Sequence, residues 1–194
     1  MSDVSRETSP LLRDYVAILL DENQRQNLIA KSTEDEVWER HIRDATQLLQ
    51  YAPHARSWVD IGSGPGLPGM VIAIETGRPT TLVEPRLLRV EFLRRVAGEL
   101  GLTNVEVVHG KAAAAHGRFD AITARAVAKA PELLRMTMHL SHSETRWVLP
   151  KGRTVQSELE ALESTWQGRF RVEPSQTDPE AGILIAEQVR PRGK

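Results

Sequence analysis

Cysteine is absent from all 194 residues of the sequence. Without thiols the protein has no disulfide framework, no thiolate zinc site and no iron–sulfur cluster. Enzymes that attack with a thiolate, or that generate radicals at a cysteine-held cluster, are therefore excluded. Histidines do not replace these ligands, because His139 and His142 stand three residues apart without further ligands at metal-site spacing. The sequence predicts no bound metal.

Long apolar runs and a large net charge are missing as well. No apolar segment approaches the ~20 residues that span a bilayer, and the polar N-terminus lacks the apolar core of a signal peptide. A hydrophobic content of 40% and a charged content of 26% are ordinary for a soluble globular chain. We therefore expect one well-buried domain with a small appendage and no membrane partner.

The net charge of −1 does not by itself indicate nucleic-acid binding. However, 20 of the 25 lysines and arginines are arginine. Arginine forms bidentate contacts with phosphates and stacks on bases better than lysine does. A GC-rich genome, whose codons favour arginine, would give the same bias, so both explanations stay open.

Residues 58–69 carry the clearest functional signal in the chain. An apolar strand reaches Asp60 and Ile61 and enters a turn with four glycines, after which an apolar helix begins. Glycine has no Cβ and accepts positive φ, so Gly62 and Gly64 allow the main chain to approach a nucleotide-like ligand closely. The turn therefore predicts a ligand site.

Two ligands compete for this turn. The spacing Gly64-x-Gly66-x-x-Gly69 matches the dinucleotide fingerprint, and an acid, Glu84, follows at about the expected distance. A pyrophosphate is anionic, though, and a carboxylate at Asp60 would repel it. S-adenosylmethionine carries an ammonium and a sulfonium but no phosphate, and Glu84 can accept hydrogen bonds from both hydroxyls of its ribose. We favour S-adenosylmethionine, with an NAD site and a plain glycine-rich surface turn as the alternatives.

Apolar periodicity divides the chain into alternating helices and strands. Helices are expected at 9–26, 34–51, 67–77, 86–101, 128–141 and 153–166. Strands are expected at 56–61, 80–84, 104–108, 119–124, 145–149 and 182–189, with a short one near 168–173. This alternation predicts parallel strand pairing, right-handed crossovers and helices on both faces of the sheet. Ligands of such sheets bind beyond the carboxyl ends of the strands, where Asp60, Glu84, the 109–113 turn and Arg125 all fall.

Several short motifs follow one another along the chain. They are Asn27-Leu28, Arg40-His41, the turn from Asp60 to Gly69, Glu84, Phe92-Leu93, the stretch from Gly101 to Val105, Arg125-Ala126 and Lys151-Gly152. Together they resemble the glucose-inhibited-division-B family of small-subunit ribosomal RNA guanine-N7 methyltransferases. The resemblance spans about residues 11–190, and the Leu-Pro-Gly ending of the turn is more specific than a bare glycine fingerprint.

The resemblance implies an α/β fold of the class I methyltransferase type. Such a fold has a Rossmann-like, mostly parallel sheet with an antiparallel C-terminal strand. It also implies S-adenosylmethionine as donor, S-adenosylhomocysteine as product, and 16S rRNA or the small ribosomal subunit as acceptor. The resemblance further implies a cytoplasmic protein, which we expect to be a monomer. Residues 1–52 are expected to form an N-terminal helical extension, and residues 53–194 the methyltransferase domain.

The resemblance also assigns site residues position by position. Gly62 and Leu67 match donor contacts in the turn, and Glu84 matches the acid that binds the ribose. Ala112 and Ala113 match the positions along the adenine, although relatives often carry an acid at the second. The expected donor-binding residues are Asp60, Gly62, Gly64, Leu67, Glu84, Ala112, Ala113 and Arg125.

Arg125 matches the arginine beside the reaction centre and is the expected catalytic residue. A structural ion pair at the strand end is the alternative for it. RNA contacts are expected at Arg40, His41, Arg86 and Lys151, and a packed or capping role is the alternative for His41.

The proposed chemistry needs few catalytic groups. Guanine N7 has a free in-plane lone pair, so no proton has to be removed before it attacks the methyl carbon, and positioning and water exclusion can supply most of the acceleration. The Asn/Asp-Pro-Pro-aromatic motif of exocyclic-amine methylases is missing. We therefore predict N7 methylation of a 16S rRNA guanine. The alternatives are a methylase of another RNA, a protein or a small molecule, and a non-catalytic RNA-binding assembly factor.

Overall fold

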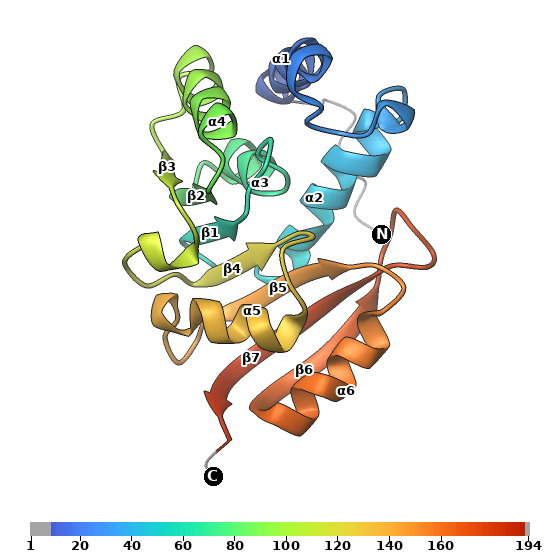
Figure 1. Ribbon diagram of the computed structural model, residues 1–194, viewed down its shortest axis with the longest axis vertical. Coiled ribbons are helices and arrows are strands. Elements are labelled where there is room, and N and C mark those ends of the chain that lie inside the picture. The colour runs from blue at the N-terminus through green and yellow to red at the C-terminus, as the bar shows by residue number, and fades with distance from the viewer. Residues whose placement is uncertain (1–8, 193–194) are drawn as a thin grey trace.

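A seven-stranded sheet with helices on both faces forms the centre of the computed structural model, which describes residues 9–192 (Figure 1). The strand order is β3-β2-β1-β4-β5-β7-β6. The strands are β1 (Trp58–Ile61), β2 (Thr80–Glu84), β3 (Val105–His109), β4 (Ala121–Ala124), β5 (Arg146–Lys151), β6 (Trp166–Pro174) and β7 (Gly182–Pro191). Residues 1–8 of the expected extension and residues 193–194 of the expected domain lie outside the described residues.

The pairing confirms the predicted class I methyltransferase fold. β1 pairs in parallel with β2 and β4, β2 with β3, and β4 with β5, whereas β7 is antiparallel to both β5 and β6. The short strand expected near 168–173 is a full nine-residue edge strand, β6. Its sequence signal is weak because most of its side chains are exposed or only half-buried.

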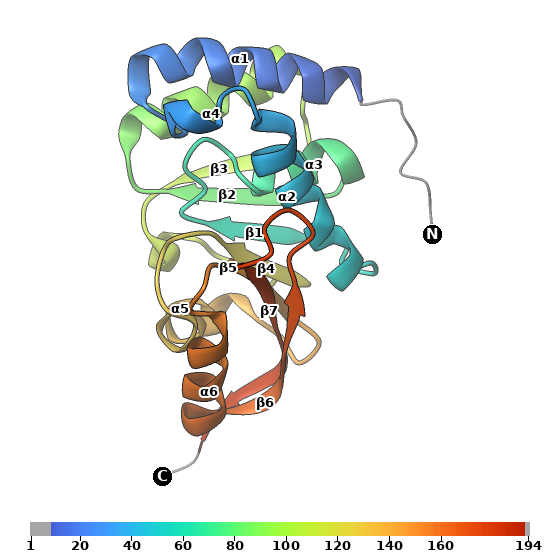
Figure 2. The same cartoon turned by 90° about the vertical axis from the view of Figure 1, so that its right-hand side faces the viewer.

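Side chains that alternate along the strands build a separate core on each face of the sheet. The helices are α1 (Pro10–Gln26), α2 (Asp44–Thr46), α3 (Gly69–Thr76), α4 (Leu87–Glu99), α5 (Ala130–Thr137) and α6 (Val155–Thr165). Val59 and Ile61 of β1 pack with side chains of α5 and α6. Leu82 of β2 packs on the opposite face with side chains of α1, α3 and α4. Figure 2 shows these two groups of helices on opposite sides of the sheet.

The helix expected at 34–51 takes a different form. After a 3₁₀ turn at Lys31–Thr33, a π-helical turn spans Trp38–Arg43, α2 follows, and a 3₁₀ segment spans Gln47–Tyr51. Apolar spacing could not reveal this, because α-, π- and 3₁₀-helical periods differ too little over six residues. The segment joins α1 to β1 and carries Arg40 and His41.

The N-terminal segment packs directly against the sheet's helices. Leu12, Tyr15 and Leu19 of α1 are buried in the same cluster as Met70 of α3 and Leu93 of α4. α1 therefore supports the turn that precedes α3. A domain boundary at residue 52 stays a prediction.

Candidate active site

The glycine-rich turn between β1 and α3, residues 62–68, is held firmly at the carboxyl edge of the sheet. The amides of Gly62 and Ser63 donate to the Val83 carbonyl at 2.7 and 3.1 Å. Gly62 has a φ of 68°, and a Cβ there would stand 2.5 Å from Cγ2 of Val127. Only glycine fits this position, since a side chain would be strained and would collide.

Glu84 ends β2 directly beside this turn. Its side chain is buried, and its two carboxylate oxygens accept hydrogen bonds from the amides of Gly64 at 2.8 Å and Arg86 at 2.9 Å. A carboxylate has about four acceptor sites, so further acceptor capacity remains for a ligand. The structure thus brings Glu84 and the glycine-rich turn together, as the sequence predicts.

Asp60 lies beneath the turn instead of facing an open surface. It is 1% exposed, its Oδ2 accepts from the Gly69 amide at 3.0 Å, and its Oδ1 is buried without a hydrogen-bond partner in the described chain. Burial raises the pKa of this carboxyl to about 7, although the Gly69 amide and Arg125 oppose the shift. A buried acceptor beside a glycine cradle fits the cationic S-adenosylmethionine and opposes a pyrophosphate.

The raised pKa of Asp60 predicts a pH-dependent stability. Its ordinary value is 3.8, so the folded protein holds this proton longer than the unfolded chain does. The stabilising contribution is full below about pH 4 and is lost as the pH rises through about 7. Urea unfolding should show the stability of wild type, relative to Asp60→Asn, falling by on the order of a few kcal/mol from about pH 4 to about pH 8. Parallel pH curves for the two proteins would contradict a raised pKa.

Gly69 is the most crowded glycine of this region. A Cβ there would lie 2.4 Å from Cδ2 of Leu82 and 2.7 Å from Oδ2 of Asp60. Gly69→Ala is therefore expected to lower the free energy of unfolding by about 3 kcal/mol. Gly98→Ala in α4 is the matched control, because among the described residues no atom beyond the adjacent helix backbone lies within 4 Å of its Cβ position. Alanine also favours helix over glycine by about 1 kcal/mol. Equal urea midpoints for the two variants would refute this crowding.

The positions expected along the adenine follow β3. Ala112 is buried and Ala113 is exposed in a 3₁₀ turn at Ala112–Ala114. The preceding Gly110 donates its amide to the Glu84 carbonyl at 3.0 Å, so this turn lies next to the end of β2. Leu67 is part of the glycine-rich turn, and its side chain is buried in the same apolar cluster as Leu12, Tyr15 and Leu19 of α1. Its expected shielding of the donor, like the adenine contacts, stays a prediction.

An open cleft of about 590 Å³ lies on the other side of the loop after β4. We call it the arginine cleft. Its polar lining comes from the 33–44 segment, the loop after β4, the end of β5 and the turn between β6 and β7. It includes Arg40, His41, Asp44, Arg125, Lys129, Lys151, Ser175 and Thr177. Val127 connects the two sites, since it lines the cleft and also contacts Gly62. A donor at the turn and an acceptor in the cleft would meet at this loop.

Arg125 extends from the end of β4 into the arginine cleft. Its Nη1 lies 3.5 Å from Oδ2 of Asp44, and its side chain is 28% exposed. The ion pair offered as an alternative is thus present. Its long distance and its place in the cleft leave the guanidinium able to contact a ligand.

The other predicted RNA contacts separate into two places. His41 shares a hydrogen bond between Nε2 and Thr33 Oγ1 at 2.9 Å, while its Nδ1 is buried without a partner in residues 9–192. Burial and the nearby Arg125 and Arg40 lower the pKa of His41 to about 4, so it is neutral at pH 7. Arg40 is exposed at the cleft. Arg86 is exposed at the start of α4 and does not line this cleft.

Lys151 belongs to the cleft wall. Its ammonium lies 2.9 Å from Oε2 of Glu158, donates to the Ala128 carbonyl at 2.8 Å, and is 9% exposed. Lys151 therefore holds the loop after β4 in place. Its predicted RNA contact is untested.

Two residues near these sites escaped the sequence prediction. Asp44 stands three residues after His41, a spacing that places both on one helix side, and this was an available signal. Tyr15 of α1 donates its hydroxyl to the Pro65 carbonyl at 3.0 Å and is fully buried. No local pattern links residues fifty positions apart. Among residues 9–192, no three acids or histidines cluster as a metal site.

Comparisons with known proteins agree with this geometry. The sequence matches the GidB family, described as rRNA small subunit methyltransferase G, over residues 8–177. It is 47% identical to the ribosomal RNA small subunit methyltransferase G of Rhizorhabdus wittichii, over 98% of this chain and 90% of that protein. It is 43% identical to the protein of the same name from Zymomonas mobilis, over 97% of this chain and 90% of that protein.

Solved structures with low sequence identity share the fold. The O-methyltransferase from Bacillus cereus in complex with SAH superposes with a TM-score of 0.65 at 15% identity, covering 96% of this chain and 94% of that chain. Such a likeness supports the class I methyltransferase architecture alone. The family match covers most of the sequence, and the relatives match nearly all of it, so this chain belongs to the rRNA small subunit methyltransferase G family.

Proposed function

We propose that this protein transfers a methyl group from S-adenosylmethionine to N7 of a guanine in 16S rRNA of the small ribosomal subunit. The observation that carries this proposal is the buried Glu84 carboxylate beside a glycine-rich turn that borders the arginine cleft. The names of the relatives support the substrate.

The donor site follows from the residues around the turn. When bound, S-adenosylmethionine supplies an electrophilic methyl group. Glu84 accepts the ribose hydroxyls, and the backbone at Gly62 and Gly64 lies against the methionine part. Asp60, whose pKa is raised to about 7, offers partial negative charge from below at neutral pH, while Ala112 and Ala113 border the adenine.

The acceptor site uses positioning instead of a general base. Arg125 orients the guanine in the arginine cleft, so that N7 points along the loop toward the glycine-rich turn. His41, neutral at pH 7 because its pKa is lowered to about 4, adds little charge to the cleft. Because N7 carries no proton, the alignment of two substrates and the exclusion of water are sufficient for catalysis.

The wider RNA contact uses Arg40, His41, Arg86 and Lys151. We propose that the protein acts as a monomer in the cytoplasm, where ribosomal subunits assemble. The described residues contain no helix long and apolar enough to cross a bilayer.

Nucleoside analysis tests the function directly. Purified protein is incubated with labelled S-adenosylmethionine and with small subunits, or naked 16S rRNA, from cells that lack it. The expected product after digestion is labelled 7-methylguanosine. A different methylated nucleoside would overturn the N7 assignment. Subunit binding without any labelled product would favour the assembly-factor alternative.

A further inference from the structure

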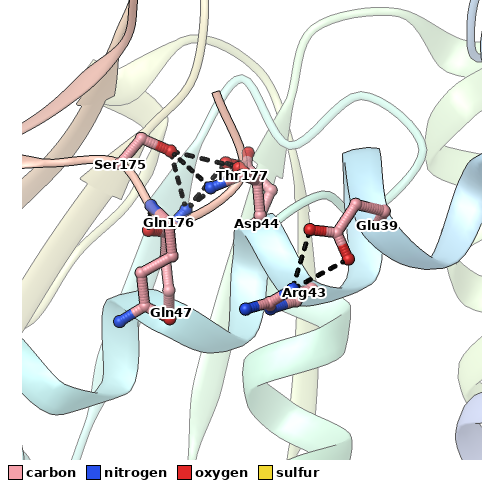
Figure 3. A network of polar contacts seen from close by, with 7 residues as sticks. All are labelled: Glu39, Arg43, Asp44, Gln47, Ser175, Gln176 and Thr177. Carbon is pink, nitrogen blue, oxygen red and sulfur yellow. Dashed lines mark hydrogen bonds and ion pairs between the residues drawn. The ribbon is translucent and has the colours of Figure 1, made fainter. Parts of the chain in front are cut away.

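Asp44 occupies a central place in the wall of the arginine cleft. It lies at the start of α2, directly after the π-helical turn that carries His41. Its side chain is 20% exposed. Figure 3 shows Asp44 facing the β6–β7 turn, while the Glu39–Arg43 ion pair lies farther along the same helix.

One oxygen of Asp44 fixes the carboxylate in position. Oδ1 accepts from Thr177 Oγ1 at 2.8 Å and from Gln47 Nε2 at 2.9 Å. Gln47 in turn accepts the Gln176 amide at 2.8 Å through its Oε1. These bonds, drawn in Figure 3, connect the helix to the β6–β7 turn and set the plane of the carboxylate.

The other oxygen of Asp44 is short of hydrogen bonds. In the described chain Oδ2 has no closer partner than Arg125 Nη1 at 3.5 Å. This distance is longer than the usual 2.7–3.2 Å of an N–H···O bond. Both groups line the cleft. The carboxylate oxygen and the guanidinium therefore lie side by side, and each can form a further hydrogen bond with a ligand.

This pairing complements the Watson–Crick edge of guanine, where N2 is the group farthest from N7. Guanine carries a hydrogen-bond acceptor at O6 and an amino donor at N2, whereas adenine has an amino group at position 6 and none at position 2. A carboxylate that binds the N2 amino group leaves N7 free for methyl transfer. A guanidinium beside it can donate to O6.

Building on the proposed function, we propose that Asp44 determines specificity for guanine. Its Oδ2 accepts a hydrogen bond from the N2 amino group of the target base, while Arg125 donates to O6. The N-terminal segment and the β6–β7 turn are then parts of the acceptor site, because Gln47 and Thr177 hold the Asp44 carboxylate that binds the base.

A substrate base that lacks only the N2 amino group distinguishes recognition of guanine by Asp44 from a purely structural role of Asp44. Inosine keeps N7 and O6 of guanine but has hydrogen at position 2. The substrates are small subunits reconstituted with 16S rRNA that carries either guanine or inosine at the mapped target position. Rates are compared for wild type, Asp44→Asn and Glu39→Gln. Glu39→Gln is the matched control, because within residues 9–192 Glu39 pairs only with the exposed Arg43, four residues along the chain.

Wild type and Glu39→Gln should prefer guanine over inosine by about tenfold or more in kcat/KM, as expected for a hydrogen bond to a charged group. Asp44→Asn should lose activity on guanine by a similar factor, show little preference between the two bases, and bind S-adenosylhomocysteine normally. Asn can still accept the Thr177 hydrogen bond. If it does not fold, Asp44→Ser provides the same comparison.

If Asp44→Asn lowers kcat/KM by the same factor on guanine and on inosine, Asp44 has only a structural role and the proposal is overturned. The proposal also fails if wild type methylates both bases equally well. In either case 7-methylguanosine is still formed, and the proposed function stands. A wild type that forms no 7-methylguanosine on either natural substrate would instead remove the proposed function and this inference together.

Discussion

Replacing Glu84 with alanine is expected to weaken binding of S-adenosylhomocysteine by at least about 100-fold. A hydrogen bond to a charged acceptor contributes about 1.5–3 kcal/mol, and the variant loses two ribose contacts. The variant also leaves the amides of Gly64 and Arg86 without the carboxylate that accepts their hydrogen bonds at 2.8 and 2.9 Å. The ligand then meets a less ordered turn. Calorimetric titration measures the loss.

Glu106→Ala is the matched control for this experiment. Glu106 is an exposed acid on the neighbouring strand β3, and its carboxylate accepts a hydrogen bond from Thr81 Oγ1 at 3.2 Å. Its removal should leave the titration unchanged. If the Glu84 and Glu106 variants bind alike, Glu84 does not hold the ribose. Wild type that binds NAD tightly and ignores S-adenosylhomocysteine would restore the dinucleotide alternative.

Arg125→Ala should lower the single-turnover rate of RNA methylation by about 100-fold, a loss typical of a displaced substrate. The guanidinium lines the arginine cleft and pairs there with Asp44 at 3.5 Å, so we expect the affinity for S-adenosylhomocysteine to fall much less than the rate. Rapid-quench assays at saturating RNA separate the chemical step from binding.

Arg43→Ala controls for the loss of a positive charge near the cleft. Arg43 directly precedes Asp44, but its side chain is exposed and pairs with Glu39 at 2.9 Å. Its variant should keep the single-turnover rate. An Arg125→Ala protein with unchanged rate and donor affinity would show that the Asp44–Arg125 contact is only a structural ion pair.

The parts of the site that depend on local backbone could be predicted from the sequence. Closely spaced glycines between an apolar strand and an apolar helix indicate a turn that needs positive φ. Parallel pairing of β1 with β2 brings the carboxyl ends of these strands to one edge of the sheet. The meeting of Glu84 with the glycine-rich turn therefore follows from topology alone. The mostly parallel sheet could be predicted as well, because helices and strands alternate along the sequence.

The parts that depend on tertiary packing could not be predicted. Sequence spacing gives no sign that Asp60 is 1% exposed, because burial of an acid depends on what packs over it. Nor does it show that Lys151 pairs with Glu158, or that Asp44 reaches Thr177 from a distant segment. These contacts cross between elements whose relative positions are set by the whole core.

The most direct test of the central claim is a map of 7-methylguanosine in 16S rRNA from cells that lack this protein. We predict that one such nucleotide disappears, that the wild-type protein restores it, and that the Glu84→Ala variant does not. A complete set of 7-methylguanosines in the deleted strain would contradict the proposed function.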